Sequence, residues 1–363
     1  MPPHPASPEH GTPHEGHLPG EHQHHDHALD TAPQDGREAG VKGVLLPVAV
    51  VLAIGTIFVT VYLAAFHAPR PHNLPVAVVG TSQQVLRIET ELDAESPGGF
   101  SVAMYPSAAQ AQDAIEHHQI YAAYISPGSV GTLGEKPMLL YASANGPTVT
   151  GTVTGAFGAA AEVGGQKLAQ QDVVPASSGD TRGLSIFYMA FGLILASYLF
   201  GTMTYQMAPR LEFRWRMASV ACCGLLGGLI VALLSGSTGF GALHAPLADI
   251  TAIASMMSAA AGLATMVFLR LVGPAGLSLA SVVLLTLGNS TSGGSMPTEY
   301  LPNWLHPLSG ILPVGVGVRA IQGAAYFHND GLGRGIAVLA AWIVVCAGIL
   351  YVRDVLGKRR AAV

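Results

Sequence analysis

The chain has 363 residues, of which 50% are hydrophobic and only 11% are charged, and its formal net charge is −5. Soluble domains carry about 25% charged residues, so this composition is typical of a membrane protein. The sequence contains no basic domain and no aromatic stacking surface, which argues against nucleic-acid binding.

The first 42 residues are predicted to be a disordered, cytoplasmic tail. Eight of the fifteen histidines lie within its first 27 residues, among proline, glycine and acidic side chains. Such a segment has too few apolar residues to bury a core. Imidazoles at this density can bind Zn or Ni, and the candidate ligands are His22, His24, His25 and His27. A solvated tail without a selected ligand is the favoured alternative.

An apolar run without any charge, Val44 to Phe66, follows the tail. A helix over this run reaches about 34 Å, enough to cross a hydrocarbon core of about 30 Å. A cleaved signal peptide is less favoured, because such segments lie within about the first 30 residues and have a shorter apolar centre. We therefore predict a transmembrane helix over residues 43–66.

Residues 67–183 are predicted to form an α/β domain outside the membrane, because strand and helix signals alternate there. The expected strands are Val76–Val79, Phe100–Tyr105, Tyr121–Ile125 and Met138–Ala142, and the expected helices are Gln83–Leu92, Ser107–His117 and Pro147–Gln170. His117 and His118 are expected at an exposed helix end. Adjacent side chains point in different directions, so we do not expect a metal site at this pair.

Residues 184–353 are predicted to form a membrane domain of five more helices, which makes six spans in all. They are expected at Leu184–Tyr205, Ala218–Gly236, Leu247–Leu269, Pro274–Gly288 and Gly335–Val352. The fifth span of the chain is the weakest of these, because its uninterrupted apolar part, Gly276–Gly288, falls short of the roughly 17 residues that a crossing helix needs. All three cysteines lie in predicted spans, where Cys usually serves as a small hydrophobic residue.

The segment 301–327 is predicted to be a short or re-entrant helix at the outer surface. Its prolines at positions 302, 307 and 313 argue against a straight crossing, since proline removes a donor and clashes with the preceding turn. Backbone that is not helical exists at membrane depth only where protein or water satisfies it, which predicts a cavity.

Three ionisable residues near the outer side are the candidates for a transport path: Arg319, Asp249 and Glu299. An ionisable group at membrane depth is costly unless it is paired or hydrated, so it marks a candidate functional site. The alternatives are that Arg319 and Asp249 extend to the outer headgroups, or that Arg319 simply pairs with Glu299.

The distribution of Lys and Arg sets the predicted orientation, because basic residues concentrate in cytoplasmic loops. With six spans, ten of the seventeen basic residues fall on one side. They are Arg37, Lys42, Arg210, Arg214, Arg216, Arg270, Arg353, Lys358, Arg359 and Arg360. The protein is therefore expected in the plasma or inner membrane of the cell. Both termini, including the basic tail 354–363, are expected on the cytoplasmic side.

This layout of one span, an external domain and five clustered spans resembles the phage infection protein (Pip) family and its nitrosoguanidine-resistance relatives. That family is similar to the permease subunits of type-2 ABC exporters. The motifs that carry the resemblance are DVVPASSGDTRGLSIFY at Asp172–Tyr188 and LGNSTSGGSMPTEYLP at Leu287–Pro302, followed by HPLSGILPVGVGVRAIQG at His306–Gly323. The resemblance covers the chain from Val44 to about Val355.

The resemblance implies a homodimeric, permease-like subunit that exports a hydrophobic or amphipathic compound or an envelope component, with a separate ATPase. It also implies that a cytoplasmic loop couples the two, and the candidates are Arg210, Arg214, Trp215 and Arg216. An ordinary positive-inside loop is the alternative. The sequence lacks Walker A, HExxH and GxSxG patterns, so no enzymatic activity is expected. The rival function is a non-transporting envelope scaffold, secretion accessory or phage-docking protein.

Overall fold

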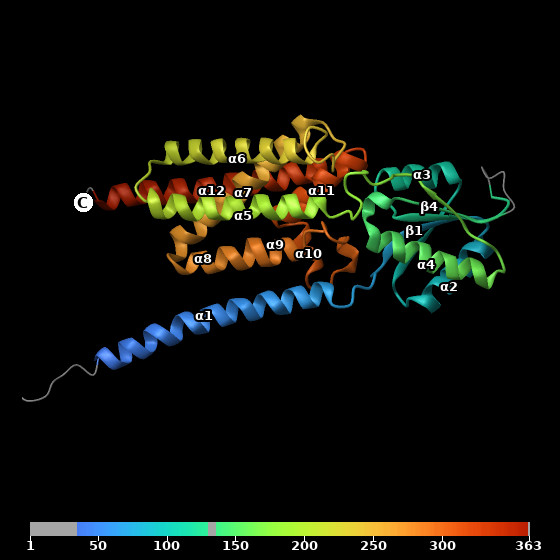
Figure 1. Ribbon diagram of the computed structural model, residues 1–363, viewed down its shortest axis with the longest axis horizontal. Helices are drawn as coiled ribbons and strands as arrows, with labels where there is room; N and C mark the ends of the chain where they lie inside the picture. The colour runs from blue at the N-terminus through green and yellow to red at the C-terminus, as the bar shows by residue number, and fades with distance from the viewer. Residues whose placement is uncertain (1–34, 130–135, 362–363) are drawn as a thin grey trace, which may run out of the picture. The chain divides into compact units, whose positions relative to one another are not determined.

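The structure is a computed structural model that describes the backbone of residues 35–129 and 136–361 and the side chains of residues 43–129 and 136–356 (Figure 1). Helix α1 (Asp35–Phe66) begins in one compact unit, which ends at Val51, and continues in the second unit, which holds the other described elements. The part of α1 from Gly43 is long and apolar enough to cross a membrane, as predicted.

Five strands form a mixed sheet in the order β2-β1-β3-β4-β5 (Figure 1). The strands are β1 (Leu74–Val79), β2 (Phe100–Tyr105), β3 (Ala122–Ile125), β4 (Met138–Tyr141) and β5 (Ala169–Asp172). β1 runs parallel to β2 and β3, β4 is antiparallel to β3, and β5 is parallel to β4. β1 is buried along nearly its whole length, as expected for a central strand covered on both faces.

Helices α2 (Ser82–Glu95) and α4 (Pro147–Val163) cover one face of the sheet, and α3 (Ala108–Glu116) covers the other (Figure 1). Thr81 begins α2 with a capping box, in which its side chain accepts from the backbone N–H of Gln84 and the Gln84 side chain accepts from Thr81 N–H. This cap places the start of α2 directly after β1.

The predicted helix Pro147–Gln170 is wrong at its end. α4 stops at Val163, because Gly164 caps it and Gly165 adopts a left-handed φ of 66°. The chain then turns into β5, which pairs with β4. β5 has the sequence AQQD and is mostly exposed, so it carries no apolar alternation from which to predict a strand.

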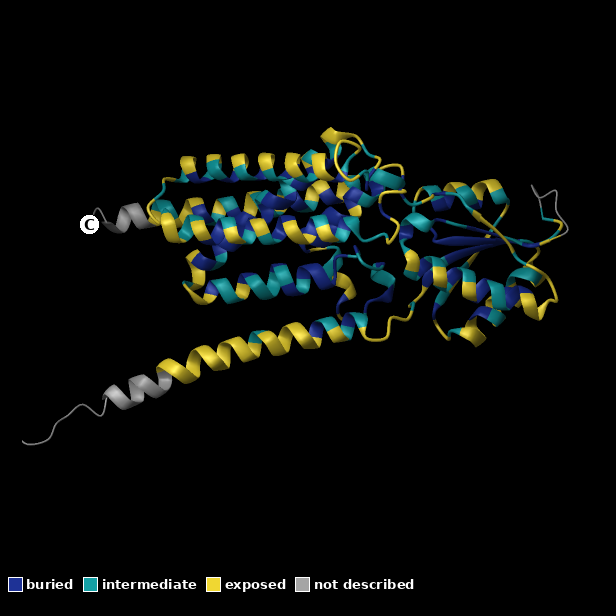
Figure 2. Cartoon of the chain, in the orientation of Figure 1, coloured by how far each residue is buried: buried dark blue, intermediate teal, exposed yellow. Residues whose placement is uncertain are grey.

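Four further helices are long and apolar enough to cross a membrane, which gives five candidate spans with α1 among the described residues. They are α5 (Ser185–Met207), α6 (Phe213–Ser235), α7 (Leu247–Val272) and α12 (Leu332–Ala361). α7 is the most buried of these helices (Figure 2): 78% of its apolar 18-residue stretch is buried, against 22–33% of the corresponding stretches in the other three. The exposed faces of α5, α6 and α12 are apolar, as in a multi-pass membrane protein.

The predicted span at Pro274–Gly288 is a shorter apolar helix over Ala275–Ser290. It consists of α8 (Ala275–Ala280), a π-helical segment η2 (Ser281–Leu287) and α9 (Gly288–Ser290). A straight α-helix of this length reaches only about 24 Å, less than a hydrocarbon core of about 30 Å. Six spans therefore stay a prediction.

The segment 301–327 contains two helices, α10 (His306–Ser309) and α11 (Pro313–Tyr326), which follow the short 3-10 helix η3 (Thr298–Tyr300). Pro313 occupies the first turn of α11, where its missing N–H costs nothing. α11 is largely buried against α7 and α12. The predicted short helix is thus present, with proline starting it rather than breaking it.

The α/β layer does not close its core by itself. Tyr300 of η3 packs into the cluster beneath α2 and α4, and Phe327, directly after α11, packs into the cluster beneath α3. Both side chains are almost fully buried. Each face of the sheet is therefore completed by a residue from the segment that the sequence assigns to the membrane domain.

Candidate functional site

A cavity of about 280 Å³ lies where the turn between α3 and β3 meets η3, α10, α11 and the start of α12. Six ionisable residues line it: His118, Tyr121, Glu299, His306, Arg319 and Arg334. Two of the three transport-path candidates, Arg319 and Glu299, therefore share one cavity. The third, Asp249, does not line it. Asp249 lies in the first turn of α7, where the helix dipole stabilises a carboxylate.

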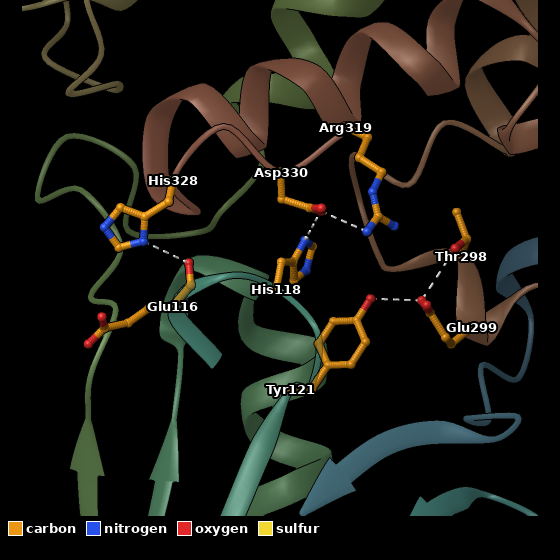
Figure 3. Close-up of polar contacts among 8 residues, drawn as sticks. All are labelled: Glu116, His118, Tyr121, Thr298, Glu299, Arg319, His328 and Asp330. Atoms are coloured by element: carbon orange, nitrogen blue, oxygen red, sulfur yellow. Dashed lines mark hydrogen bonds and ion pairs between the residues drawn. The ribbon is translucent and has the colours of Figure 1, made fainter. Parts of the chain in front are cut away.

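Arg319 projects from α11 and forms an ion pair with Asp330, with Nη2 2.8 Å from Oδ2 (Figure 3). The simple pairing of Arg319 with Glu299 is therefore wrong, because Asp330 in the turn before α12 takes that role. Gly331 makes room for the arginine: it has a φ of 73°, and a Cβ there would lie 2.9 Å from Arg319 Cγ. Another residue at position 331 would displace the guanidinium.

Glu299 is held by the α/β domain. The Tyr121 hydroxyl donates to Glu299 Oε2 at 2.8 Å, and the Thr298 hydroxyl lies 3.3 Å from the same oxygen (Figure 3). The backbone N–H of His72 donates to the Glu299 carbonyl oxygen at 2.9 Å. Burial, followed by the Glu299 charge, raises the pKa of Tyr121 well above its usual value, so the hydroxyl remains a donor.

His118 is buried, in contrast to the exposed helix end predicted for it. Its side chain is 7% exposed, and its ring stacks on Phe327 with centroids 4.1 Å apart. Nδ1 lies 3.6 Å from Asp330 Oδ2, too far for a hydrogen bond (Figure 3). Among the described residues, neither ring nitrogen has a hydrogen-bond partner. This burial could not be predicted from the sequence, since Phe327 and Asp330 lie more than 200 positions away in the chain.

The neighbouring His117 is exposed, as predicted, and caps the end of α3. It stacks on His328, whose Nδ1 lies 3.3 Å from the Glu116 carbonyl oxygen. His328 and Asn329 both adopt left-handed φ values, 47° and 67°. These tight turns let the α11–α12 connection reach the end of α3.

A further unpaired donor lies on the wall of the cavity. Asn145 is 8% exposed, and its side-chain Nδ2 has no hydrogen-bond partner within the described part of the chain. A buried polar atom without a partner costs about 1–3 kcal/mol, so such an atom calls for a water or a ligand.

The coupling-loop candidates do not form one cluster of side chains in the structure. Arg216 is buried and bonds Asp354 of α12 at 2.8 Å, while Arg270 of α7 bonds the same carboxylate at 3.1 Å. This network fastens α6, α7 and α12 together at one end. Arg214 pairs with Glu212 and lies over the Trp215 ring on the surface.

The loop before α6 has no helix of its own, because α6 already begins at Phe213. Arg214, Trp215 and Arg216 therefore belong to the first turn of α6, and only Arg210, which is exposed, precedes it. A coupling role for these residues stays a prediction.

The candidate metal ligands His22, His24, His25 and His27 lie outside the described residues. Within residues 35–129 and 136–361, no group of three His, Cys, Asp or Glu side chains is placed to hold a metal ion. Binding of Zn or Ni by the tail stays a prediction.

Comparisons with protein-family models, with curated proteins and with solved structures find no match for this chain. The resemblance to the Pip family therefore rests on the sequence motifs alone.

Proposed function

We propose that this chain is a permease-like subunit of an exporter in the plasma or inner membrane. Its cargo would be a hydrophobic or amphipathic compound or an envelope component, and a separate ATPase would supply the energy. The observation that carries the proposal is the cavity in which Arg319, from a helix that is mostly apolar and buried, lies with Glu299. Ionisable groups beside apolar helices are costly, so they mark candidate substrate pathways.

We also propose six crossings, with the α/β domain outside and both termini in the cytoplasm. α7 ends beside Arg270, which bonds Asp354, and the shorter helix Ala275–Ser290 leads from there to Glu299, which bonds Tyr121. Along α12, Arg334 and Asp354 are about 30 Å apart, which is the thickness of a hydrocarbon core. The shorter helix thus joins two polar ends of the bundle, which supports its role as a crossing in addition to the five longer helices.

We also propose a homodimer in which a path opens between subunits, and the exposed apolar face of α6 offers a surface for the second copy. Leu225, Leu226 and Ile230 are all exposed there, and lipid or a second copy must cover them in a membrane. Alternating exposure of the path to the two sides would then move the cargo.

Replacing Arg319 by Ala tests the role of the cavity. We expect export to fall by about tenfold or more while membrane levels stay near normal, because the pair that Arg319 makes with Asp330 is half-exposed and stabilises the fold little. Arg319→Lys should restore part of the activity if charge alone matters. The measurement is cargo efflux, or resistance to a toxic cargo, at matched protein abundance.

Arg87→Ala is the matched control, since Arg87 is an exposed arginine on α2 that does not line the cavity. Full export by Arg319→Ala would remove the cavity from the transport path. The rival function, a non-transporting envelope scaffold or docking protein, predicts that no nucleotide-binding subunit copurifies with the chain or is stimulated by it.

A further inference from the structure

We propose that the cavity binds a phosphate group, and that Arg334, Arg319, His118 and Asn145 are the donors that hold it. This inference rests on the proposed function only in that the phosphate would belong to the cargo or to a lipid beside it. The binding itself is a property of the purified chain. Arg334 and Asn145 are not among the residues that the sequence singles out.

The charges on the wall favour an anion. Two guanidinium groups, those of Arg319 and Arg334, line the cavity with one carboxylate, that of Glu299, and a second carboxylate, Asp330, pairs with Arg319. Arg334 has no ion-pair or hydrogen-bond partner among the described residues, and Arg319 uses Nη2 for Asp330, which leaves its other nitrogens free of protein partners there. Guanidinium groups bind phosphate oxygens in a planar, bidentate geometry.

The buried donors are the second, independent indication. The His118 ring nitrogens and Asn145 Nδ2 are buried without hydrogen-bond partners in the described chain, and both residues line the cavity. Asp330 faces His118 from the α11–α12 turn, but at 3.6 Å it satisfies neither nitrogen. An oxyanion can accept from several such donors at once, whereas a neutral apolar ligand would leave them all unsatisfied.

Size and the remaining charge narrow the ligand class. A cavity of about 280 Å³ lies near the lower end of the roughly 300–1,000 Å³ range of small-molecule sites, which suits a small phosphorylated headgroup. Glu299 accepts from Tyr121 and Thr298 through Oε2, so its Oε1 remains available. The carboxylate repels a second anionic group and favours a hydroxyl or a protonated amine on the same ligand.

The test is a titration of the purified, full-length chain in detergent with phosphoethanolamine, inorganic phosphate and glycerol bisphosphate, followed by calorimetry. We expect phosphoethanolamine to bind more tightly than the bisphosphate. Arg334→Ala should weaken binding by about tenfold or more, since a hydrogen bond to a charged group is lost. Arg214→Ala, at an exposed arginine outside the cavity, should leave binding unchanged.

His118→Phe separates the ring nitrogens from the packing of the ring. It keeps the stack on Phe327 but removes both ring nitrogens, so we expect weaker phosphate binding with little change in thermal stability. Binding by the Arg334→Ala and His118→Phe variants at wild-type strength would overturn the proposal.

The source of the phosphate is distinguished by repeating the titration with the chain in nanodiscs, with and without phosphatidylethanolamine. Competition by the lipid identifies a headgroup site, and undiminished binding identifies a soluble phosphate compound. If the wild-type chain binds phosphate but Arg319→Ala exports normally, the proposed function alone is refuted. If the wild-type chain exports its cargo but binds no phosphate, this inference alone is refuted.

Discussion

Asp330 links two side chains at the edge of the cavity. It pairs with Arg319 at 2.8 Å and lies 3.6 Å from Nδ1 of His118. The approach of His118 and the Arg319 guanidinium lower the pKa of Asp330 to about 2, against the opposing effect of burial. The carboxylate is therefore charged at every physiological pH, and the turn before α12 always presents an anion to α11 and α3.

The low pKa of Asp330 predicts a pH dependence of stability. Because its pKa in the folded chain lies below the usual 3.8, the stabilisation is present above about pH 4 and is lost as the pH falls toward 2. We expect Asp330→Asn to destabilise the protein by about 1 kcal/mol at neutral pH, a value reduced by solvent screening. The difference from wild type should vanish near pH 2.

Thermal unfolding in detergent between pH 7 and pH 2.5 measures this effect. Glu89→Gln, at an exposed carboxylate of α2 without an ion-pair partner in the described chain, is the control. A constant difference between wild type and Asp330→Asn across that range would show that the carboxylate charge does not stabilise the fold.

At the scale of elements, the residue that follows α11 completes the apolar core on one face of the α/β domain. Phe327 is fully buried in the cluster beneath α3 and stacks on His118. Tyr300 fills the corresponding place on the other face of the sheet. Tyr300 of η3 and Phe327 after α11 therefore fasten these two elements to opposite faces of the sheet.

Phe327→Ala should loosen the packing of the segment after α11 against α3 and His118. Loss of a fully buried phenylalanine costs about 3–5 kcal/mol, and we expect the α3–β3 turn to become accessible to protease at the same time. Phe240→Ala is the control, because Phe240 is 79% exposed and should cost far less. Limited proteolysis and thermal unfolding of the two variants provide the comparison. Equal protease sensitivity and equal thermal stability of the two variants would contradict the packing role of Phe327.

The elements differ in how well the sequence predicts them, for physical reasons. β1 to β4 are short apolar runs bounded by turn residues, so periodicity locates them within two residues. β5 is polar and exists only because β4 offers it an edge. The π-helical segment η2 has no sequence signal, since its residues are those of an ordinary apolar helix.

The site is predicted only in part, for a similar reason. Arg319 stands out because it interrupts an apolar segment. His118 and Asp330 do not, because their roles depend on contacts between segments far apart in the chain. The docking of Phe327 and Tyr300 is invisible for the same reason, since each is simply an aromatic residue near an apolar run.

At the scale of the whole molecule, the second compact unit has two polar ends joined by apolar helices. One end holds Arg216, Arg270 and Asp354, and the other holds the cavity with Arg319 and Arg334. The basic cluster predicts that the first end faces the cytoplasm. The helix Ala275–Ser290 determines the parity, because five crossings place the termini on opposite sides and six place them on the same side.

Cysteine labelling in intact cells tests this topology. In a variant without Cys222, Cys223 and Cys346, single cysteines at Glu95 of α2 and Ser237 after α6 should react with an impermeant reagent, since both positions are exposed and lie outside in the six-span arrangement. Cysteines at Ala32 and Ala362 should react only after the cells are permeabilised. Labelling of Ala362 from outside, with Ala32 protected, would mean that the shorter helix returns without crossing. Labelling of Ala32 from outside would invert the whole arrangement and place Arg216, Arg270 and Asp354 at the outer surface.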